Sequence, residues 1–372
     1  MSTDSDRYIF EAEWYDKVAY TLRKFYLYYF PSDNSVELFD LKTRKTFLRR
    51  TKCEGVEAKD FYVGAIVTIF SRSIKIINFA DQATKDKLSY QIIRAFIIVK
   101  SDAVDKLSDI LNHVNNHDFH ISNIKLAKIN HEDAIQIFKS TIGKSPFHDQ
   151  ILIEICSSHI VESMTSGPVI ALELLSKDGS SKWCELSAAF GKSALLNGVY
   201  VPDNKDDILP YFFPSEKSKS KIKNSAKLQH CTCCIIKPHA VQSRLIAPII
   251  NDVRKANFVI SAIQQFHIDP VNAEEFLEVY KGVLPDYAAM VSELQSGPCI
   301  VMEITHKDEN FDVVNEFRKL CGPMDPKMAK QLHPNTLRAK YGKTRIQNAV
   351  HCSDLPEDGL LEVEYFFKIL DN

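Results

Sequence analysis

The sequence predicts an α/β (α+β) protein in which a small β-rich domain precedes two tandem copies of a ferredoxin-like α/β domain. Short aromatic and β-branched runs, separated by turn residues, fill residues 7–84 and indicate antiparallel hairpins. Four segments of the remaining chain recur in the same order, which indicates an internal repeat. Within each copy, apolar strands alternate with amphipathic helices. A chain of 372 residues is long enough for three such domains.

The composition is that of a soluble globular protein, with 45% hydrophobic and 25% charged residues. A formal charge of −2 argues against a general attraction to nucleic acid or anionic membranes. No apolar run approaches the roughly 20 residues of a membrane span, and residues 1–6 lack signal-peptide features. We therefore expect a cytoplasmic protein with neither a membrane partner nor a specific nucleic-acid partner.

Residues 1–90 are expected to form the β-rich domain, with strands near residues 26–31, 36–40, 46–48, 65–70 and 74–79. This part contains no Gly-rich phosphate loop and no His/Asp/Glu constellation, so we interpret it as a docking module. The aromatic pattern of residues 10–16, 25–30 and 47–50 resembles the DM-ten domain of ciliary and flagellar proteins. That resemblance implies a pleckstrin-homology-like β fold without catalysis. It also implies the axoneme of a cilium or flagellum, the cytoskeleton or the centrosome as location, and tubulin, microtubules or other axonemal proteins as partners.

The repeat pairs residues 98–104 with 235–241, 119–124 with 258–263, 166–173 with 296–303, and 211–213 with 365–367. The offset rises from 130 to 154 between the last two pairs, so the first copy lacks 24 residues there. We expect the copies to span residues 91–216 and 229–372. The lysine-rich segment 217–228 between them is interpreted as a solvated linker; a strip that binds tubulin or nucleic acid is the less favoured alternative.

The second copy shows the alternation most clearly. We expect strands at residues 233–236, 258–266 and 299–304, and helices at 248–256, from Asp269 onward, at 285–295 and at 311–320. Pro248 suits a first helical turn, and Asn257 suits a left-handed residue after the helix. In the helix from Asp269, one face is expected to carry Phe276, Leu277 and Tyr280.

Nine cysteines are scattered from Cys53 to Cys352. Cys231, Cys233 and Cys234 cluster, but no second pair stands at zinc-ligand spacing. We favour small apolar residues in a buried strand of a reduced protein over a metal site at this cluster.

Candidate phosphate-binding residues also gather in the second copy. Lys237 ends an apolar strand, and Arg318 and Arg338 each follow an apolar helical pattern. A guanidinium can hold phosphate oxygens with two hydrogen bonds. Taken singly, such residues are most often surface lysines and surface ion pairs, and a histidine such as His351 is most often structural. Their occurrence together with Asn348 leads us to predict a site in which His351 accepts a phosphoryl group.

The motif Asn348-Ala-Val-His351-Cys352-Ser353-Asp354 resembles the Asn-x-x-His-(Gly/Ala)-Ser-Asp signature of the nucleoside diphosphate kinase family. The match extends to Lys237-Pro238, Phe258, Tyr280, residues 296–298, Arg318, residues 334–338 and residues 362–367. A DM-ten domain followed by two kinase domains resembles one animal branch of that family. The resemblance implies a phosphotransferase that moves the γ-phosphate of ATP, or another nucleoside triphosphate, to a nucleoside diphosphate through phospho-His351.

The same resemblance implies a role for each matched residue. Glu362 would orient the His351 ring, and Lys237, Arg318 and Arg338 would neutralise charge on the transferred group. Lys237 and Asn348 would also hold the ribose, Tyr280 would donate to the γ-phosphate, and Tyr287 is the candidate for stacking on the base. Mg²⁺ would bridge the phosphates mostly through water and nucleotide oxygens, so no residue is assigned as a metal ligand.

Some residues depart from the family pattern. In the second copy, Cys352 replaces Gly or Ala, His239 replaces an acidic residue and Met324 replaces a threonine. Each substitution can slow transfer without abolishing it. In the first copy, aligning residues 191–200 with 342–351 puts Tyr200 at the position of His351, and Ser101 replaces the proline after Lys100. We expect the first copy to be catalytically inactive and retained for packing or docking.

Two functions therefore fit the sequence. One is phosphotransfer by the second copy alone, which the His351 set favours. The other is a non-catalytic structural role in axonemal or centrosomal microtubules, for example as a microtubule inner protein, which the β-rich domain and the degenerate first copy favour. Single-domain members of the family commonly form hexamers, but here we expect a monomer whose two copies form an internal pseudo-dimer.

Overall fold

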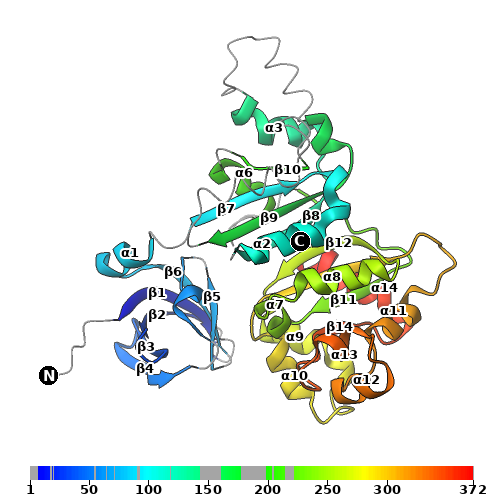
Figure 1. Cartoon of the computed structure of the whole chain (residues 1–372). Helices are drawn as coiled ribbons and strands as arrows, with labels where there is room; N and C mark the ends of the chain where they lie inside the picture. The colour runs from blue at the N-terminus through cyan, green and yellow to red at the C-terminus, as the bar shows by residue number, and fades with distance from the viewer. Residues whose placement is uncertain are drawn as a thin grey trace. The chain divides into compact units, whose positions relative to one another are not determined.

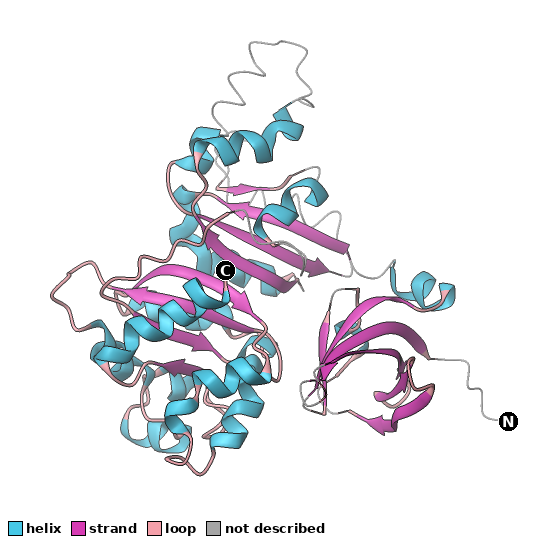
Figure 2. Ribbon diagram, turned by 180° about the vertical axis from the view of Figure 1, so that it is seen from behind, coloured by secondary structure: helices cyan, strands magenta, loops and turns pink. Residues whose placement is uncertain are grey.

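Six antiparallel strands form the N-terminal sheet, in the order β4-β3-β2-β1-β6-β5 (Figures 1 and 2). The strands are β1 (Tyr8–Asp16), β2 (Thr21–Phe30), β3 (Ser35–Asp40), β4 (Lys45–Lys52), β5 (Ile66–Ile69) and β6 (Arg72–Phe79), followed by helix α1 (Gln82–Ser89). Strand β1 was not among the predicted strands, although the buried Phe10 and Ala12 alternate with the more exposed Glu11 and Glu13. Aromatic side chains fill the core, where the rings of Tyr29 and Phe61 lie 4.3 Å apart.

The computed structural model describes residues 7–16, 19, 21–53, 56–63, 65–70, 72–89, 93–117, 119–142, 161–176, 198–202, 205–213 and 222–371. Two units emerge from the contacts: residues 1–92 with 268–297, and residues 93–267 with 298–372. Residues 191–197 of the first-copy alignment and 217–221 of the lysine-rich segment lie outside the described residues. No helix in the described part of the chain is long and apolar enough to cross a membrane.

In the first unit, residues 268–297 form α9 (Pro270–Phe276), the 3₁₀ turn η3 (Glu278–Tyr280) and α10 (Tyr287–Leu294). The Asp269 carboxylate caps α9 by accepting from the Asn272 N–H at 2.9 Å. The predicted start of this helix is confirmed, but its predicted length is wrong. The chain tightens into η3 after Phe276 and then turns at Gly282, which has a φ of 76°. Tyr280 therefore does not share a helical face with Phe276.

The second unit is built on one eight-stranded antiparallel sheet, in the order β10-β7-β9-β8-β12-β13-β11-β14 (Figure 1). The first copy supplies β7 (Ile93–Val99), β8 (His120–Ala127), β9 (Val169–Ser176) and β10 (Val199–Tyr200). The second supplies β11 (Thr232–Ile236), β12 (Val259–Phe266), β13 (Cys299–Thr305) and β14 (Val350–Cys352). The strand order of one copy mirrors that of the other, which confirms that one fold is repeated. The copies join where β8 pairs with β12.

Helices cover both faces of this sheet. The first copy carries the 3₁₀ segment η2 (Ser101–Lys106), α2 (Leu107–Asn116), α3 (His131–Ile142) and α6 (Lys205–Phe212). The second carries α7 (Pro238–Gln242), α8 (Ile246–Lys255), α11 (Val313–Cys321), α12 (Pro326–Leu332), α13 (Leu337–Tyr341), α14 (Pro356–Glu364) and the π-helical η4 (Tyr365–Leu370). Ile97 and Val99 of β7 share a core with α2 and α8, while Phe96 and Ile98 pack with α3 and α6. This alternation buries both faces of the strand.

The predicted boundaries in the second copy hold within a few residues. Helix α8 begins at Ile246, so Pro248 lies in its first turn. Asn257 adopts a φ of 65° after that helix, as predicted. Cys233 and Cys234 lie fully buried in β11, which agrees with their interpretation as apolar strand residues.

The described part of the lysine-rich segment differs from a solvated linker. Ile222 and Ser225 are buried, and Asn224 forms a β-bridge with Ala127 of β8. The Asn224 side chain donates to the carbonyl of Phe367 and to the carboxylate of Asp371, both at 2.8 Å. Lysine content predicted solvent exposure, but the residues between the lysines are apolar or can form hydrogen bonds, and these dock on the sheet.

Candidate active site

His351 lies in β14 at the edge of the sheet, where it is opposite Ile235 of β11 and only 7% exposed. Its Nε2 is 2.9 Å from Oε2 of Glu362 on α14. The same carboxylate oxygen accepts the Ser353 hydroxyl at 2.8 Å, and the Ser353 oxygen accepts the Cys233 N–H at 3.2 Å. A hydrogen bond to an ionised carboxylate favours the neutral tautomer in which Nε2 carries the proton and the lone pair lies on Nδ1.

Burial of the His351 ring and the charges around it shift its pKa in opposite directions. Burial opposes the protonated form, but the Glu362 carboxylate and the Cys352 sulfur favour it, and together they raise the pKa of His351 above its ordinary value. The neighbouring Lys237 ammonium lowers that pKa. Because only the neutral ring has a nitrogen lone pair, the fraction of chains in which His351 can act as a nucleophile declines as the pH falls through this raised pKa.

Lys237 ends β11 and forms the N-cap of α7, with Pro238 at the first helical position. Its side chain is buried, and Nζ donates to the carbonyl of Ile346 at 2.9 Å. Its backbone N–H donates to the carbonyl of Ala349, also at 2.9 Å. The strand end therefore holds an ammonium group against the segment that leads into His351.

Arg338 lies in α13, and its guanidinium is engaged on all three nitrogens by the protein. Nε donates to the carbonyl of Val350 at 3.2 Å, Nη1 to the carbonyl of Gly322 at 2.8 Å, and Nη2 lies 3.7 Å from the Cys352 sulfur. This arginine is buried. It therefore serves as a brace for β14 as well as a candidate phosphate ligand.

The Cys352 thiol is acidified by its neighbours. A hydrogen bond from Cys321 has the largest effect, and the Arg338 and His351 charges add to it, so the pKa of Cys352 lies below its ordinary value despite burial. Burial and the same hydrogen bond raise the pKa of Cys321. The Cys352 sulfur thus ionises more readily than an ordinary buried thiol, and it lies 3.7 Å from Arg338 Nη2. Cys321 belongs to α11, and no signal in the sequence indicated its effect on the pKa of Cys352.

Arg318 and Asn348 also contact the segment around His351. Arg318 is half exposed, and it donates to the Asp354 carbonyl at 3.1 Å and faces the Asp354 carboxylate at 3.4 Å. Asn348 is buried and donates through Nδ2 to the carbonyl of Met324 at 3.1 Å. Its Oδ1 is a buried acceptor without a hydrogen-bond partner among the described residues. Such an acceptor suits a hydroxyl donor, for example from a sugar.

The structure thus brings six of the predicted residues to the 346–354 segment: Lys237, Arg318, Arg338, Asn348, His351 and Glu362. The two predicted tyrosines, Tyr280 and Tyr287, belong to the first unit. There the Tyr287 hydroxyl donates to the carbonyl of Glu274 at 3.2 Å, and the Tyr280 N–H donates to the carbonyl of Leu277 at 3.0 Å.

The first copy has the backbone of this site but not its histidine. The Lys100 N–H donates to the carbonyl of Gly198 at 2.8 Å, as that of Lys237 does to Ala349. Tyr200 is opposite Ile98 in the sheet, as His351 is opposite Ile235. The predicted alignment of Tyr200 with His351 is therefore confirmed by strand register. Lys100 is buried, and burial lowers its pKa.

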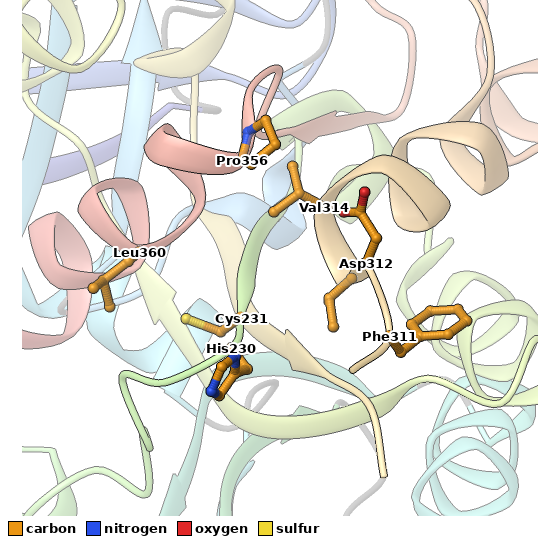
Figure 3. Close-up of a pocket in the computed structure, with 8 residues that line it drawn as sticks. His230, Cys231, Phe311, Asp312, Val314, Pro356 and Leu360 are labelled. Atoms are coloured by element: carbon orange, nitrogen blue, oxygen red, sulfur yellow. The ribbon is translucent and has the colours of Figure 1, made fainter. Parts of the chain in front are cut away.

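A cavity of about 230 Å³ lies elsewhere in the second unit (Figure 3). It is lined by His230, Cys231, Phe311, Asp312, Val313, Val314, Pro356 and Leu360. All of the predicted site residues lie in the described part of the chain, and none of them lines this cavity. We therefore place the candidate chemistry at β14 rather than in this cavity.

Comparisons with known proteins agree with the motifs. The family model described as nucleoside diphosphate kinase matches residues 93–194 and 230–371, and the DM10 domain model matches residues 1–84. The chain is 41% identical to "Nucleoside diphosphate kinase homolog 7" of Rattus norvegicus and of Mus musculus, across 99% of this chain and 94% of each relative. It is 38% identical to "Nucleoside diphosphate kinase 2" of Protochlamydia amoebophila, across 38% of this chain and 92% of that protein.

Proposed function

The chain belongs to the nucleoside diphosphate kinase family, as its motifs predict, and from this premise we propose that its second copy alone transfers phosphate through His351. The observation that carries the proposal is the 2.9 Å contact between His351 Nε2 and Glu362, which leaves Nδ1 for attack on the γ-phosphate of a nucleoside triphosphate. The phosphoryl group then passes from Nδ1 to the terminal oxygen of a nucleoside diphosphate. The bond from phosphorus to the leaving diphosphate breaks in the first step, and the bond to Nδ1 breaks in the second.

Each neighbouring residue has a place in this proposal. Lys237, Arg318 and Arg338 would neutralise charge on the transferred group, which is the main contribution that a protein makes to phosphoryl transfer. Asn348, through its partnerless Oδ1, would accept a hydrogen bond from a ribose hydroxyl, and the Lys237 ammonium would donate one to the ribose. We propose Tyr280 as a donor to the γ-phosphate and Tyr287 as a stacking partner for the base.

Members of this family use nucleoside triphosphates and Mg²⁺. The donor set at β14 suits phosphate oxygens, because it consists of cationic and amide groups and because the Glu362 carboxylate is already engaged by His351 and Ser353. Mg²⁺ therefore fits this site as the ion of a nucleotide complex, where it supplies neutralisation of phosphate charge. The protein residues supply position and orientation.

The experiment that tests the proposal labels the full chain with ATP that carries a radioactive γ-phosphate. We expect a phosphate on the protein that is labile in acid and stable in alkali, and that moves to an added nucleoside diphosphate. A chain that acquires no label, or a label that no diphosphate removes, would exclude phosphotransfer through a histidine.

Replacing Cys352 with alanine is expected to speed labelling about tenfold, because a single preorganised donor is commonly worth that much or more. The change releases Arg338 Nη2 from the sulfur and lowers the pKa of His351, which the Cys352 charge raises. The gain should grow as the pH rises through the lowered pKa of Cys352 and shrink in acid, where the thiol is neutral and only the release of Arg338 Nη2 contributes. Single-turnover labelling of the variant and the wild-type chain at a series of pH values measures this gain in rate. Cys299→Ala, which removes another buried cysteine, is the control; an equal or slower rate for C352A would refute the explanation.

We also propose that the chain is a monomer whose two copies form an internal pseudo-dimer. Pairing of β8 with β12 already joins the strands of the two copies into one sheet within one chain. Sedimentation should give one species of 42.4 kDa, whereas a stable multiple of that mass would contradict the proposal.

A structural role in axonemal or centrosomal microtubules is a second candidate, which one feature of the β-rich domain favours. Strand β4 is an exposed sheet edge, and residues 42–52 contain six cations and no acidic residue. Such an edge suits an acidic partner surface, as microtubules present. Deleting residues 1–90 should remove co-sedimentation with microtubules; retention of binding by the deletion variant would locate docking elsewhere.

A further inference from the structure

The backbone just before His351 is held in a strained turn. Ala349 has a φ of 73°, in the left-handed region that side chains disfavour, and it is fully buried. The Val350 N–H donates back to the carbonyl of Asn348 at 3.0 Å, which closes a γ-turn around Ala349. A γ-turn with a positive φ is rare, and it persists only where the surrounding structure holds it.

Lys237, which follows β11, and His239 of α7 both hold this turn. The Ala349 carbonyl accepts the backbone N–H of Lys237 at 2.9 Å. The Ala349 N–H donates to Nε2 of His239 at 3.2 Å. His239 is 5% exposed, so water does not readily replace this acceptor. Nε2 is therefore the acceptor that His239 offers to this turn.

The turn sets the distance between two residues of the proposed site. Asn348 precedes Ala349, and His351 follows it by two positions, so the bend at Ala349 fixes where the amide and the imidazole lie relative to each other. His351 itself is anchored on its other side by Glu362. A relaxed Ala349 would shift the start of β14, and small displacements of a nucleophile cost phosphoryl transfer heavily.

We infer that His239 is a positioning residue, whose Nε2 holds the Ala349 N–H and thereby the strained turn that presents His351 to the nucleotide. This inference rests on the proposed function. His239 replaces the acidic residue of the family pattern with an imidazole acceptor, so it adds no negative charge where phosphates would bind. In the first copy the corresponding residue is Asp102, which is exposed.

The test compares His239→Ala with His239→Gln, because glutamine can place an acceptor oxygen near the position of Nε2. The exposed His230→Ala is the matched control. We expect H239A to lower the single-turnover rate of His351 labelling about 10- to 100-fold, with ATP affinity changed less than about threefold. H239Q should recover most of that loss. Wild-type rates in H239A, or equal losses in both variants when both unfold at the wild-type temperature, would overturn the inference.

A second measurement does not depend on activity. In wild-type protein, nitrogen NMR should show a coupling across the hydrogen bond between the Ala349 amide and His239 Nε2. Exchange of the Ala349 amide should accelerate about tenfold in H239A and return in H239Q. Absence of the coupling would overturn the role of His239 even if labelling succeeds. Conversely, a wild-type chain that shows the coupling but takes no label would refute the proposed function and leave the hydrogen bond established.

Discussion

Replacing His351 with alanine is expected to abolish phosphate labelling of the whole chain rather than halve it. The register of the two copies places Tyr200 where a second nucleophile would lie, and a phenol has no neutral nitrogen lone pair for attack. Loss of the nucleophile should lower diphosphate phosphorylation more than about 10³-fold. Labelling of the full chain and a coupled assay of diphosphate phosphorylation measure the two effects.

His333→Ala provides the control, because His333 is an exposed histidine at the end of α12 and contributes nothing to the proposed site. It should label at the wild-type rate. Acid-labile phosphate that remained on H351A would assign activity to the first copy, and it would contradict the view that only one of the two sites has survived.

Replacing Asp371 with alanine is expected to destabilise the second unit by about 3 kcal/mol, as removal of one member of a buried ion pair commonly does. Lys125 of β8 is only 1% exposed, and its Nζ lies 3.4 Å from both carboxylate oxygens of Asp371. Burial lowers the pKa of Lys125, and the Asp371 charge opposes that shift. The same carboxylate accepts from Gln264 at 2.6 Å and from Asn224 at 2.8 Å. Removing it leaves the ammonium and two amides without that acceptor.

The pair connects the first copy to the C-terminal segment of the second, so its loss should weaken the join between the copies. Urea denaturation followed by far-UV circular dichroism measures the effect as a lower midpoint. Lys125→Met is the matched variant: it removes the buried charge, costs less than D371A, and should restore stability when added to D371A. An unchanged midpoint for D371A, or no recovery in the double variant, would show that the pair does not stabilise the join.

Periodicity and repeat spacing were enough to predict the α/β architecture. The strands predicted at residues 233–236, 258–266 and 299–304 are β11, β12 and β13, and buried Glu173 and Glu303 occupy matched positions in β9 and β13. Local chemistry was also informative where a single residue determines the backbone conformation, as at Asn257 after α8 and at Asp269, the N-cap of α9.

What the sequence did not predict depends on contacts between distant segments. The hydrogen bonds from Arg338 to Gly322, Val350 and Cys352 arise only when α13 lies against β14. Similarly, an alanine carries no signal for a positive φ, so the turn at Ala349 and its bond to His239 were not predictable. The motif could identify the residues of the site, but not which of them are braced by the protein itself.

The position of the phosphate on the His351 ring tests the central claim most directly. Since Nε2 is held by Glu362, the phosphoryl group should attach to Nδ1, and it should attach at no other residue of the chain. Phosphorus NMR of the labelled chain, with mass spectrometry of the peptide that contains residues 346–354, distinguishes the two ring isomers. The predicted result is a single phosphohistidine substituted at Nδ1 of His351. Phosphate on Nε2, or on a residue of the first copy, would contradict the account.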